Sequence, residues 1–344
     1  MIIRSRAPMR IYFGGGGTDI SPYPEEYGGV VLGATINKYV YGTLIPKYDS
    51  QVQLVSEHHK QSTSFNVKET PNYGDNLDFI KAVMQIMGIK HGVDIFMRGD
   101  MPPESGLGSG ASAVVAAIGL VNHLKTIRTD EKPLNNYETA DLAYKIMKQV
   151  SGREQGRQNH YASVFGGLNL IEFKGGSNVT VSPIKIKKEY VLELEKNLLL
   201  VYVGARGSQQ ETSKMMVSQQ ASYLQKEKIE ILHKLKQIAY NQYKALLRGD
   251  FVHFGELISE AWSNKKKLNP LMTNDWIEKV HATALQNGAI GGRIMGAGGG
   301  GYMIFYCDID KEHLVAKELE KLGCRVTSFG FEFDGLQTWK LGEF

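Results

Sequence analysis

The chain has 344 residues, of which 42% are hydrophobic and 22% charged, as in a globular protein with a sizeable core. These values exclude an intrinsically disordered chain, and no apolar run is long enough to predict a membrane span. The net charge of +4 favours small anionic ligands over nucleic acid, and only two cysteines predict a cytoplasmic protein without a disulfide framework.

The first half of the chain is predicted to be rich in strands. Short runs of β-branched and aromatic residues separated by turn residues indicate strands, and apolar residues at helical spacing indicate helices. The helix that follows residue 110 is apolar on nearly every side, which is typical of a buried helix. The expected strands are residues 2–13, 30–46, 51–56, 63–67, 92–98, 167–173 and 179–184, and the expected helices are residues 76–88, 110–124 and 137–150.

The second half mixes helices and strands. Strands are expected at residues 198–203 and 302–306, a long helix at 211–247, shorter helices at 251–263, 275–287 and 311–322, and further strands at the end. The lysine run at 265–267 is interpreted as a solvated face. We therefore predict two α+β halves, residues 1–185 and 186–344, with the ligand site in the cleft between them.

The strongest motif is a glycine-rich loop that runs directly into the buried helix. Glycine lets the backbone turn tightly and approach a ligand, and the start of a helix offers unpaired N–H groups to a phosphate. A tight turn that caps the helix would need only one of these glycines. The predicted phosphate-binding residues are Gly106, Leu107, Gly108, Ser109, Gly110, Ala111 and Ser112, and the hydroxyls of Ser109 and Ser112 could also hold Mg²⁺.

Two common nucleotide-binding patterns fit this loop less well. The pattern GxxxxGK[ST] is absent because no lysine follows the glycines. The dinucleotide pattern GxGxxA is met from Gly106 to Ala111, but two prolines precede it, and only Asp130 or Glu131 loosely supplies the expected acidic residue. An NAD-dependent oxidoreductase therefore remains a weaker alternative.

A second glycine cluster follows the first predicted strand. Gly15, Gly16 and Gly17 lie in a run of four glycines, and Thr18 and Asp19 come directly after it. Four glycines form a backbone shelf without side chains, and a hydroxyl and a carboxylate suit the hydroxyls of a sugar. The alternative is a flexible turn in which Asp19 caps a helix.

The third cluster precedes the predicted strand at 302–306. We expect its glycines to let the backbone pack closely against the phosphate loop, while a bulge or a hairpin turn explains them equally well. The residues concerned are Gly296, Gly298, Gly299 and Gly300.

These three clusters, in this order, resemble the three motifs of the GHMP small-molecule kinases. The segment PPESGLGSGAS is similar to the phosphate loop of that family, and the glycines after residue 295 are similar to its third motif. The segments RSRAPMRIYFGGGGTDISPY and QNHYASVFGG resemble the heptose 7-phosphate kinase branch, whose members phosphorylate sugars at the anomeric hydroxyl. The resemblance covers essentially the whole chain.

The resemblance implies a two-domain α+β fold with the active site in the cleft. The N-terminal domain would hold a left-handed βαβ unit, and the C-terminal domain would be ferredoxin-like. The implied reaction moves the γ-phosphoryl group of MgATP to the anomeric hydroxyl of a heptose 7-phosphate, giving a bisphosphate for nucleotide-heptose and surface glycan synthesis. Its partners would be ATP and a sugar phosphate, with no nucleic acid and no membrane. A fucose-like sugar remains an alternative substrate.

The resemblance also implies roles for charged residues. Arg10 stands where many members carry a lysine and would neutralise charge near the transferred group. A basic side chain must also meet the phosphate of the substrate. Arg157, Arg153 and Arg206 are candidates by residue type, and the sequence does not choose among them.

The chain departs from the family pattern at two positions. Gly110 replaces a serine that often helps to hold the metal. Asn159 replaces the aspartate proposed to take the proton of the sugar hydroxyl, and an amide cannot accept that proton at neutral pH. We favour transfer without a strong base, because a loose transition state needs little early proton removal. His160 or Glu154 as the base, or a binding protein with little activity, are the alternatives.

Overall fold

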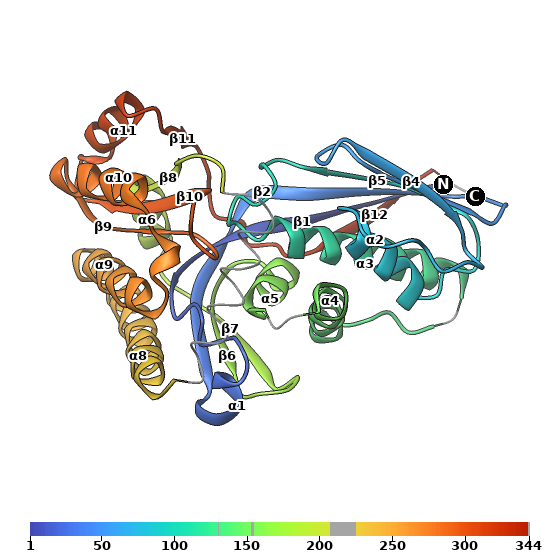
Figure 1. Cartoon of the computed structure of the whole chain (residues 1–344), viewed down its shortest axis with the longest axis horizontal. Helices are drawn as coiled ribbons and strands as arrows, with labels where there is room; N and C mark the ends of the chain where they lie inside the picture. Colours follow the sequence, from blue (N-terminus) through green and yellow to red (C-terminus); the bar gives the residue numbers. More distant parts are fainter. Residues whose placement is uncertain (130, 153–154, 207–224, 343–344) are drawn as a thin grey trace.

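The computed structural model describes residues 1–129, 131–152, 155–206 and 225–342. In these residues the strands form two sheets that lie at opposite ends of an elongated molecule (Figure 1). One sheet has eight strands and the other has four. The mixture of mainly antiparallel sheets with packed helices is the α+β architecture expected from the sequence.

The larger sheet is organised around one long central strand, β2. The first half of β2 pairs with β6 and the second half pairs with β5, while β1 runs along its other side. Among the described strands of this sheet, only β3 and β5 pair in parallel. The strands are β1 (Ile2–Gly14), β2 (Gly29–Pro46), β3 (Gln51–Ser56), β4 (Gln61–Asn66), β5 (Val93–Gly99), β6 (Leu168–Phe173), β7 (Val179–Pro183) and β12 (Gln337–Leu341).

This topology overturns the oxidoreductase alternative. A dinucleotide-binding fold is built on a mostly parallel sheet with helices on both faces. Here the strands on either side of β2 are antiparallel to it. The GxGxxA match at Gly106 to Ala111 is therefore a coincidence of the glycine-rich loop, because two glycines at this spacing suit any loop that must turn sharply into a helix.

Helices cover one face of the larger sheet (Figure 1). The central one, α3, packs on β1 and β2, and its nearly uniform apolar surface is buried in the main core, as the sequence predicts. Among the described residues, α3 is also the one helix long and apolar enough to cross a membrane by length and composition, and in this fold it is a core helix. The helices on this side are α2 (Asp78–Ile86), α3 (Ser109–Arg128), α4 (Asn136–Ser151) and α5 (Gln158–Phe165). The short helix α1 (Tyr23–Tyr27) lies apart from them, and its Tyr23 belongs to a core cluster with Leu232 and Leu235.

The smaller sheet is antiparallel, in the order β11-β8-β10-β9, and has its own core around Trp262 and Phe305. Its strands are β8 (Leu198–Tyr202), β9 (Ala289–Ile294), β10 (Tyr302–Cys307) and β11 (Arg325–Thr327). The helices of this half are α6 (Lys188–Asn197), α8 (Lys226–Arg248), α9 (Phe251–Leu268), η1 (Pro270–Met272), α10 (Asp275–Gln286) and α11 (Glu312–Lys321).

The last strand does not follow the division expected at residues 185 and 186. After β11 the chain returns to the larger sheet, where β12 pairs antiparallel with β1 and Ile2 lies opposite Leu341. The pairing satisfies backbone groups that β1 would otherwise expose at a sheet edge. The boundary itself stays a prediction. Part of the expected helix at 211–247 falls outside the described residues, since α8 begins at Lys226.

Candidate active site

A cavity of about 730 Å³ runs along the start of α3. The phosphate loop and Arg10 of β1 line one part of it, α2 and β5 line another, and Asn159 of α5 and Gly296 complete it. A cavity of this size is large enough for a nucleotide-sized ligand. It therefore brings together residues of the phosphate loop, the third glycine cluster and the first strand, which lie far apart in the sequence.

The phosphate loop ends in a helix start without a side-chain cap. Gly106 and Gly108 have φ angles of +85° and +83°, a backbone region that favours glycine. Gly108 is the N-cap of α3, and no side chain of the described residues bonds to the first N–H groups of this helix. These N–H groups and the positive end of the helix dipole are available to an anion.

The third glycine cluster packs directly against this loop. A Cβ atom on Gly106 would lie 2.7 Å from the carbonyl oxygen of Met295, and one on Gly296 would lie 3.0 Å from the Cα of Gly106. The N–H of Tyr302 donates to the Ser105 carbonyl at 3.0 Å. The two backbone segments can approach this closely because neither carries side chains at the contact. Gly298, Gly299 and Gly300 also have positive φ angles.

Arg10 connects the phosphate loop to Asn159. Its Nε and Nη2 atoms both donate to Oδ1 of Asn159, at 2.9 and 2.6 Å, and its Nη1 donates to the Gly106 carbonyl at 2.5 Å. Burial lowers the pKa of Arg10 to about 10, which still leaves the guanidinium charged at neutral pH. The structure thus brings together the two residues predicted to be catalytic, and their roles stay predictions.

The hydroxyls predicted to hold a metal differ in accessibility. The Ser112 hydroxyl is buried and donates to the Pro8 carbonyl at 3.0 Å, with the Gly108 carbonyl at 3.3 Å. Ser109 is half-buried and lines the cavity, as does Gly110. Leu107 is buried, and its carbonyl accepts from the backbone N–H of Arg10 at 3.0 Å. Of these two hydroxyls, only that of Ser109 belongs to a residue that lines the cavity, and its role in metal binding stays a prediction.

The glycine shelf is tied to the start of α5 by Asp19. Oδ1 of Asp19 accepts from the N–H of Gly17 at 3.0 Å, and its Oδ2 accepts from the N–H of Gln158 at 3.1 Å. The Thr18 hydroxyl contacts the carbonyls of Gly15 and Val30, each at 2.8 Å. Both side chains are fully buried. Thr18 thus holds the shelf in place. A contact of the sugar with Asp19, Thr18 and the shelf glycines, including Gly16, stays a prediction.

The basic residues proposed for the substrate phosphate have other partners. Arg157 is buried, lies 3.3 Å from a carboxylate oxygen of Glu25 and stacks on the ring of Tyr144. Arg206 lines the cavity and donates to the carbonyls of Met295 and Gly300 at 2.8 and 3.3 Å. Arg153 lies outside the described residues, as do Glu154 and Asp130.

His160 points away from the cavity into the core. Its ring is fully buried, with Nε2 at 3.1 Å from the sulfur of Met147 and Nδ1 at 3.3 Å from the Arg157 carbonyl. Burial lowers the pKa of His160 to about 4. A ring with this environment is a weak base without access to a ligand, so the geometry disfavours the alternative in which His160 replaces the missing aspartate.

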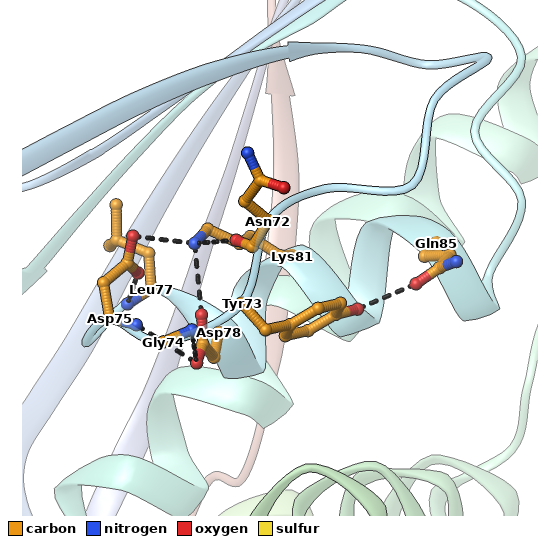
Figure 2. A network of polar contacts seen from close by, with 8 residues as sticks. All are labelled: Asn72, Tyr73, Gly74, Asp75, Leu77, Asp78, Lys81 and Gln85. Carbon is orange, nitrogen blue, oxygen red and sulfur yellow. Dashed lines mark hydrogen bonds and ion pairs between the residues drawn. The ribbon is translucent and has the colours of Figure 1, made fainter.

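Sequence reasoning missed the polar network at the α2 end of the cavity (Figure 2). The Lys81 ammonium is buried and bonds to Oδ2 of Asp75 at 2.7 Å, to Oδ1 of Asp78 at 3.1 Å and to the Asn72 carbonyl at 2.6 Å. Burial by itself would lower the pKa of Lys81, but these two carboxylates outweigh it and raise the pKa. Both aspartates line the cavity. The helical spacing of Asp78 and Lys81 was the only signal in the sequence.

A second missed group lies behind the glycine shelf. Tyr12 of β1 is buried between Arg10 and Arg293, whose guanidinium carbons lie 5.3 and 4.2 Å from its ring centroid. Lys265 of α9 is also buried, which corrects the interpretation of 265–267 as a solvated face; Lys267 alone is exposed. Successive residues of a helix point about 100° apart, so one run of lysines can face both the core and the solvent.

Family models identify the architecture around this site. Residues 77–167 match the model of the GHMP kinases N terminal domain, and residues 243–325 match that of the GHMP kinases C terminal domain. The chain is 31% identical to D-glycero-alpha-D-manno-heptose 7-phosphate kinase of Campylobacter jejuni, over 98% of this chain and 99% of that protein.

Two further relatives are similar over most of this chain. A crystal structure described as a D-glycero-D-manno-heptose 1-phosphate kinase from Bacteroides thetaiotaomicron is 30% identical, with a TM-score of 0.80 over 99% of this chain and 100% of that one. The bifunctional fucokinase/GDP-fucose pyrophosphorylase of Arabidopsis thaliana is 26% identical over 91% of this chain and 31% of that protein.

Proposed function

Since the chain belongs to the GHMP kinase family and is a phosphotransferase with an alcohol group as acceptor, we propose that it phosphorylates the anomeric hydroxyl of a heptose 7-phosphate with ATP. The observation that carries this proposal is the position of Arg10, which bonds to the phosphate loop through Gly106 and to Asn159 on α5. One guanidinium group thus lies between the surface that would bind the ATP phosphates and the residue that would face the acceptor.

The proposed transfer breaks the bond between the γ-phosphorus of ATP and the oxygen that bridges it to the β-phosphate. A new bond forms between this phosphorus and the anomeric oxygen, and the hydroxyl proton is released. The free N–H groups at the start of α3 would hold the phosphates, and Arg10 would neutralise charge on the transferred group. Catalysis is then mainly positioning and electrostatic stabilisation.

Asn159 would orient the reacting groups without taking the proton. Its Oδ1 accepts both hydrogen bonds from Arg10, which fixes the guanidinium plane. The amide nitrogen of Asn159 is then free to donate to the acceptor oxygen, in a side chain that lines the cavity. In a loose transition state the proton can leave late, to a phosphate oxygen or to water, so transfer does not require a carboxylate at this position.

The oxygen atoms beside the phosphate loop are suitable ligands for Mg²⁺. This ion prefers oxygen ligands and is commonly held by one or two protein oxygens together with phosphates and water. The Ser109 hydroxyl and the Glu104 carboxylate both line the cavity beside the loop, while Ser112 is bonded to the backbone. When bound, the ion would neutralise negative charge on the phosphates. Ser109 and Glu104 would orient it.

The choice of a heptose rests on the relatives. The Campylobacter and Bacteroides proteins, at 31% and 30% identity, are both described as heptose phosphate kinases, although their names differ in the position of the phosphate. A fucose-like sugar is the second candidate, because the Arabidopsis fucokinase is 26% identical over most of this chain. ATP and two buried free cysteines suit the cytoplasm as the place of action.

The test is mass spectrometry of reactions that contain MgATP and one sugar each. The panel holds heptose 7-phosphate, the same heptose without phosphate, fucose, galactose and mannose. A bisphosphate formed from heptose 7-phosphate, at a rate well above the other sugars, is the expected result. Preferential formation of fucose 1-phosphate would assign the chain to the second candidate. ATP binding without transfer to any sugar would contradict both and support a binding protein.

A further inference from the structure

A group of buried positive charges lies behind the glycine shelf and has no role in the transfer step itself. We call Lys265 of α9 and Arg293 of β9 the buried cationic pair. Lys265 is 2% exposed and Arg293 is fully buried. Both come from the C-terminal half, but Arg293 reaches across to β1, where its Nη1 donates to the Phe13 carbonyl at 3.0 Å. Arg293 therefore contacts the strand that leads into the shelf.

The guanidinium of Arg293 has hydrogen-bonding capacity to spare. Nε and Nη2 are buried and neither makes a well-formed hydrogen bond in the described residues, although the Tyr12 side chain is close enough to interact with the guanidinium. Its guanidinium carbon lies 4.2 Å from the centroid of the Tyr12 ring. Buried donors without acceptors are rare in native proteins, because their loss of water is not compensated. Two on one fully buried charged group indicate that a ligand supplies the acceptors.

The charges around the pair are also unbalanced. Within the described ranges, Tyr12 and Asp19 are the groups that favour the charge on Lys265, and Asp19 is the one carboxylate among them. The oxygens of Asp19 already accept from the N–H groups of Gly17 and Gln158. Burial lowers the pKa of both Lys265 and Arg293, which shows that their charges are costly in the free protein. An anion would offset this cost.

The buried cationic pair is connected through Tyr12 to the part of the site that would bind the sugar. The Tyr12 ring contacts both the guanidinium of Arg10, which belongs to the transfer site, and the guanidinium of Arg293. The shelf passes over this ring, and a Cβ atom on Gly16 would collide with it. A sugar whose anomeric hydroxyl meets Arg10 and Asn159 would thus extend along the shelf, with its far end towards the pair.

Resting on the proposed function, we propose that Lys265 and Arg293 bind the phosphate group that the sugar substrate already carries. Two cations, one of them planar with two free donors, are the chemistry that recognises a phosphate. Among the other candidates, Arg206 bonds to backbone carbonyls, and Arg157 pairs with Glu25, although its Nε also lacks a partner among the described residues. The pair makes the enzyme selective for phosphorylated over free sugars, while Arg10 and Asn159 act at the anomeric hydroxyl of the sugar.

The experiment compares heptose 7-phosphate with the same heptose without phosphate as substrates of the wild type and of Lys265→Met. Loss of one charged contact lowers kcat/KM for the phosphorylated sugar by about 10- to 100-fold and leaves the free sugar nearly unchanged. Lys265→Arg keeps the charge and restores most of the preference. Lys267→Met removes an exposed charge two residues away on the same helix and is the matched control. Arg293→Gln gives the same selective loss.

Equal losses of kcat/KM for both sugars in Lys265→Met and Arg293→Gln would overturn the proposal, since they would indicate a structural role. An unchanged preference would overturn it as well. Calorimetry without ATP separates this proposal from the proposed function. If the wild type transfers phosphate to no sugar, the kinase proposal fails, yet tighter binding of the phosphorylated heptose that is lost in Lys265→Met still supports the phosphate site. Equal binding of both sugars by the wild type contradicts it.

Discussion

Two nitrogen atoms of Arg10 donate to the same oxygen of Asn159, at 2.9 and 2.6 Å. These two hydrogen bonds fix the plane of the guanidinium. They also occupy Oδ1 of Asn159, so this oxygen is not available to the proton of the sugar hydroxyl. Asn159 therefore orients Arg10 as an aspartate at this position would, but it carries no negative charge. Arg10 keeps its full positive charge for a phosphoryl group, which distinguishes this site from one in which an aspartate neutralises the arginine.

The first prediction concerns Asn159. In Asn159→Asp the two hydrogen bonds from Arg10 are retained, so kcat changes by less than about tenfold, since early proton removal contributes little. In Asn159→Leu the acceptor is lost, Arg10 is no longer oriented, and kcat falls by about 100-fold with a smaller change in KM. Steady-state kinetics of both variants with MgATP and the accepted sugar measure this. A rise of kcat by several orders of magnitude in Asn159→Asp would show that a base is limiting.

The second prediction concerns His160 and pH. Its pKa is about 4 in the folded protein and 6.5 as a free side chain, so the unfolded chain binds a proton first as the pH falls. The free energy of unfolding therefore decreases between pH 6.5 and pH 4, by about 2 kcal/mol from pH 7 to pH 5. In His160→Gln this part of the pH dependence disappears while kcat stays within a few-fold. Urea unfolding at several pH values measures it, and an unchanged slope would contradict the assignment.

The third prediction concerns the contact between the glycine clusters. Gly106→Ala places a Cβ atom 2.7 Å from the Met295 carbonyl at a φ of +85°, so the loop must shift. We expect KM for ATP to rise by about tenfold or more and the protein to lose about 1–3 kcal/mol of stability. Gly110→Ala is the stability control, because its Cβ would meet only the end of the Met147 side chain at 3.8 Å. Equal melting temperatures of the two variants would contradict this.

The fourth prediction concerns Lys81. Removal of its ammonium in Lys81→Met leaves Asp75 and Asp78 facing each other without a cation, which costs about 3 kcal/mol of stability at neutral pH. The pKa of Asp75 is held low partly by its hydrogen bond from Lys81, so it rises in the variant. The loss of stability in Lys81→Met is then smaller at low pH, where the carboxylates protonate. Unfolding by denaturant at pH 7 and pH 4 measures the difference.

Patterns with strong local causes could be predicted from the sequence. The strand β3 has the predicted bounds, and the buried helix α3 lies where its uniform apolar surface places it. The three glycine clusters were recognisable because a run of glycines has few explanations other than close approach or an unusual backbone angle. Arg10 and Asn159, separated by 149 positions, could be placed together only through the family resemblance.

Other parts depend on contacts that the sequence does not display. The helix α5, which carries Asn159, is short and lies between glycines, so its periodicity was too weak to detect. The strand β9 contains two adjacent glycines that disfavour a strand. Both are needed, because a Cβ on Gly291 would collide with the carbonyl of Gly255 and one on Gly292 would collide with the ring of Phe305. The residues next to Lys265 and Arg293 in the sequence do not indicate that these two side chains are buried. Only the packing of α9 against β9 and β1 shows that they are buried.

The return of β12 to β1 has a consequence for the order in which the molecule is assembled. On the ribosome, β1 emerges well before β12, and its outer edge must wait for residues 337–341, which are translated more than 300 positions later. The nascent larger sheet thus carries an open edge until β12 is translated, where another chain could add a strand. Pairing of β12 closes this edge, so the larger sheet is completed only after β8, β9, β10 and β11 of the smaller sheet have been made.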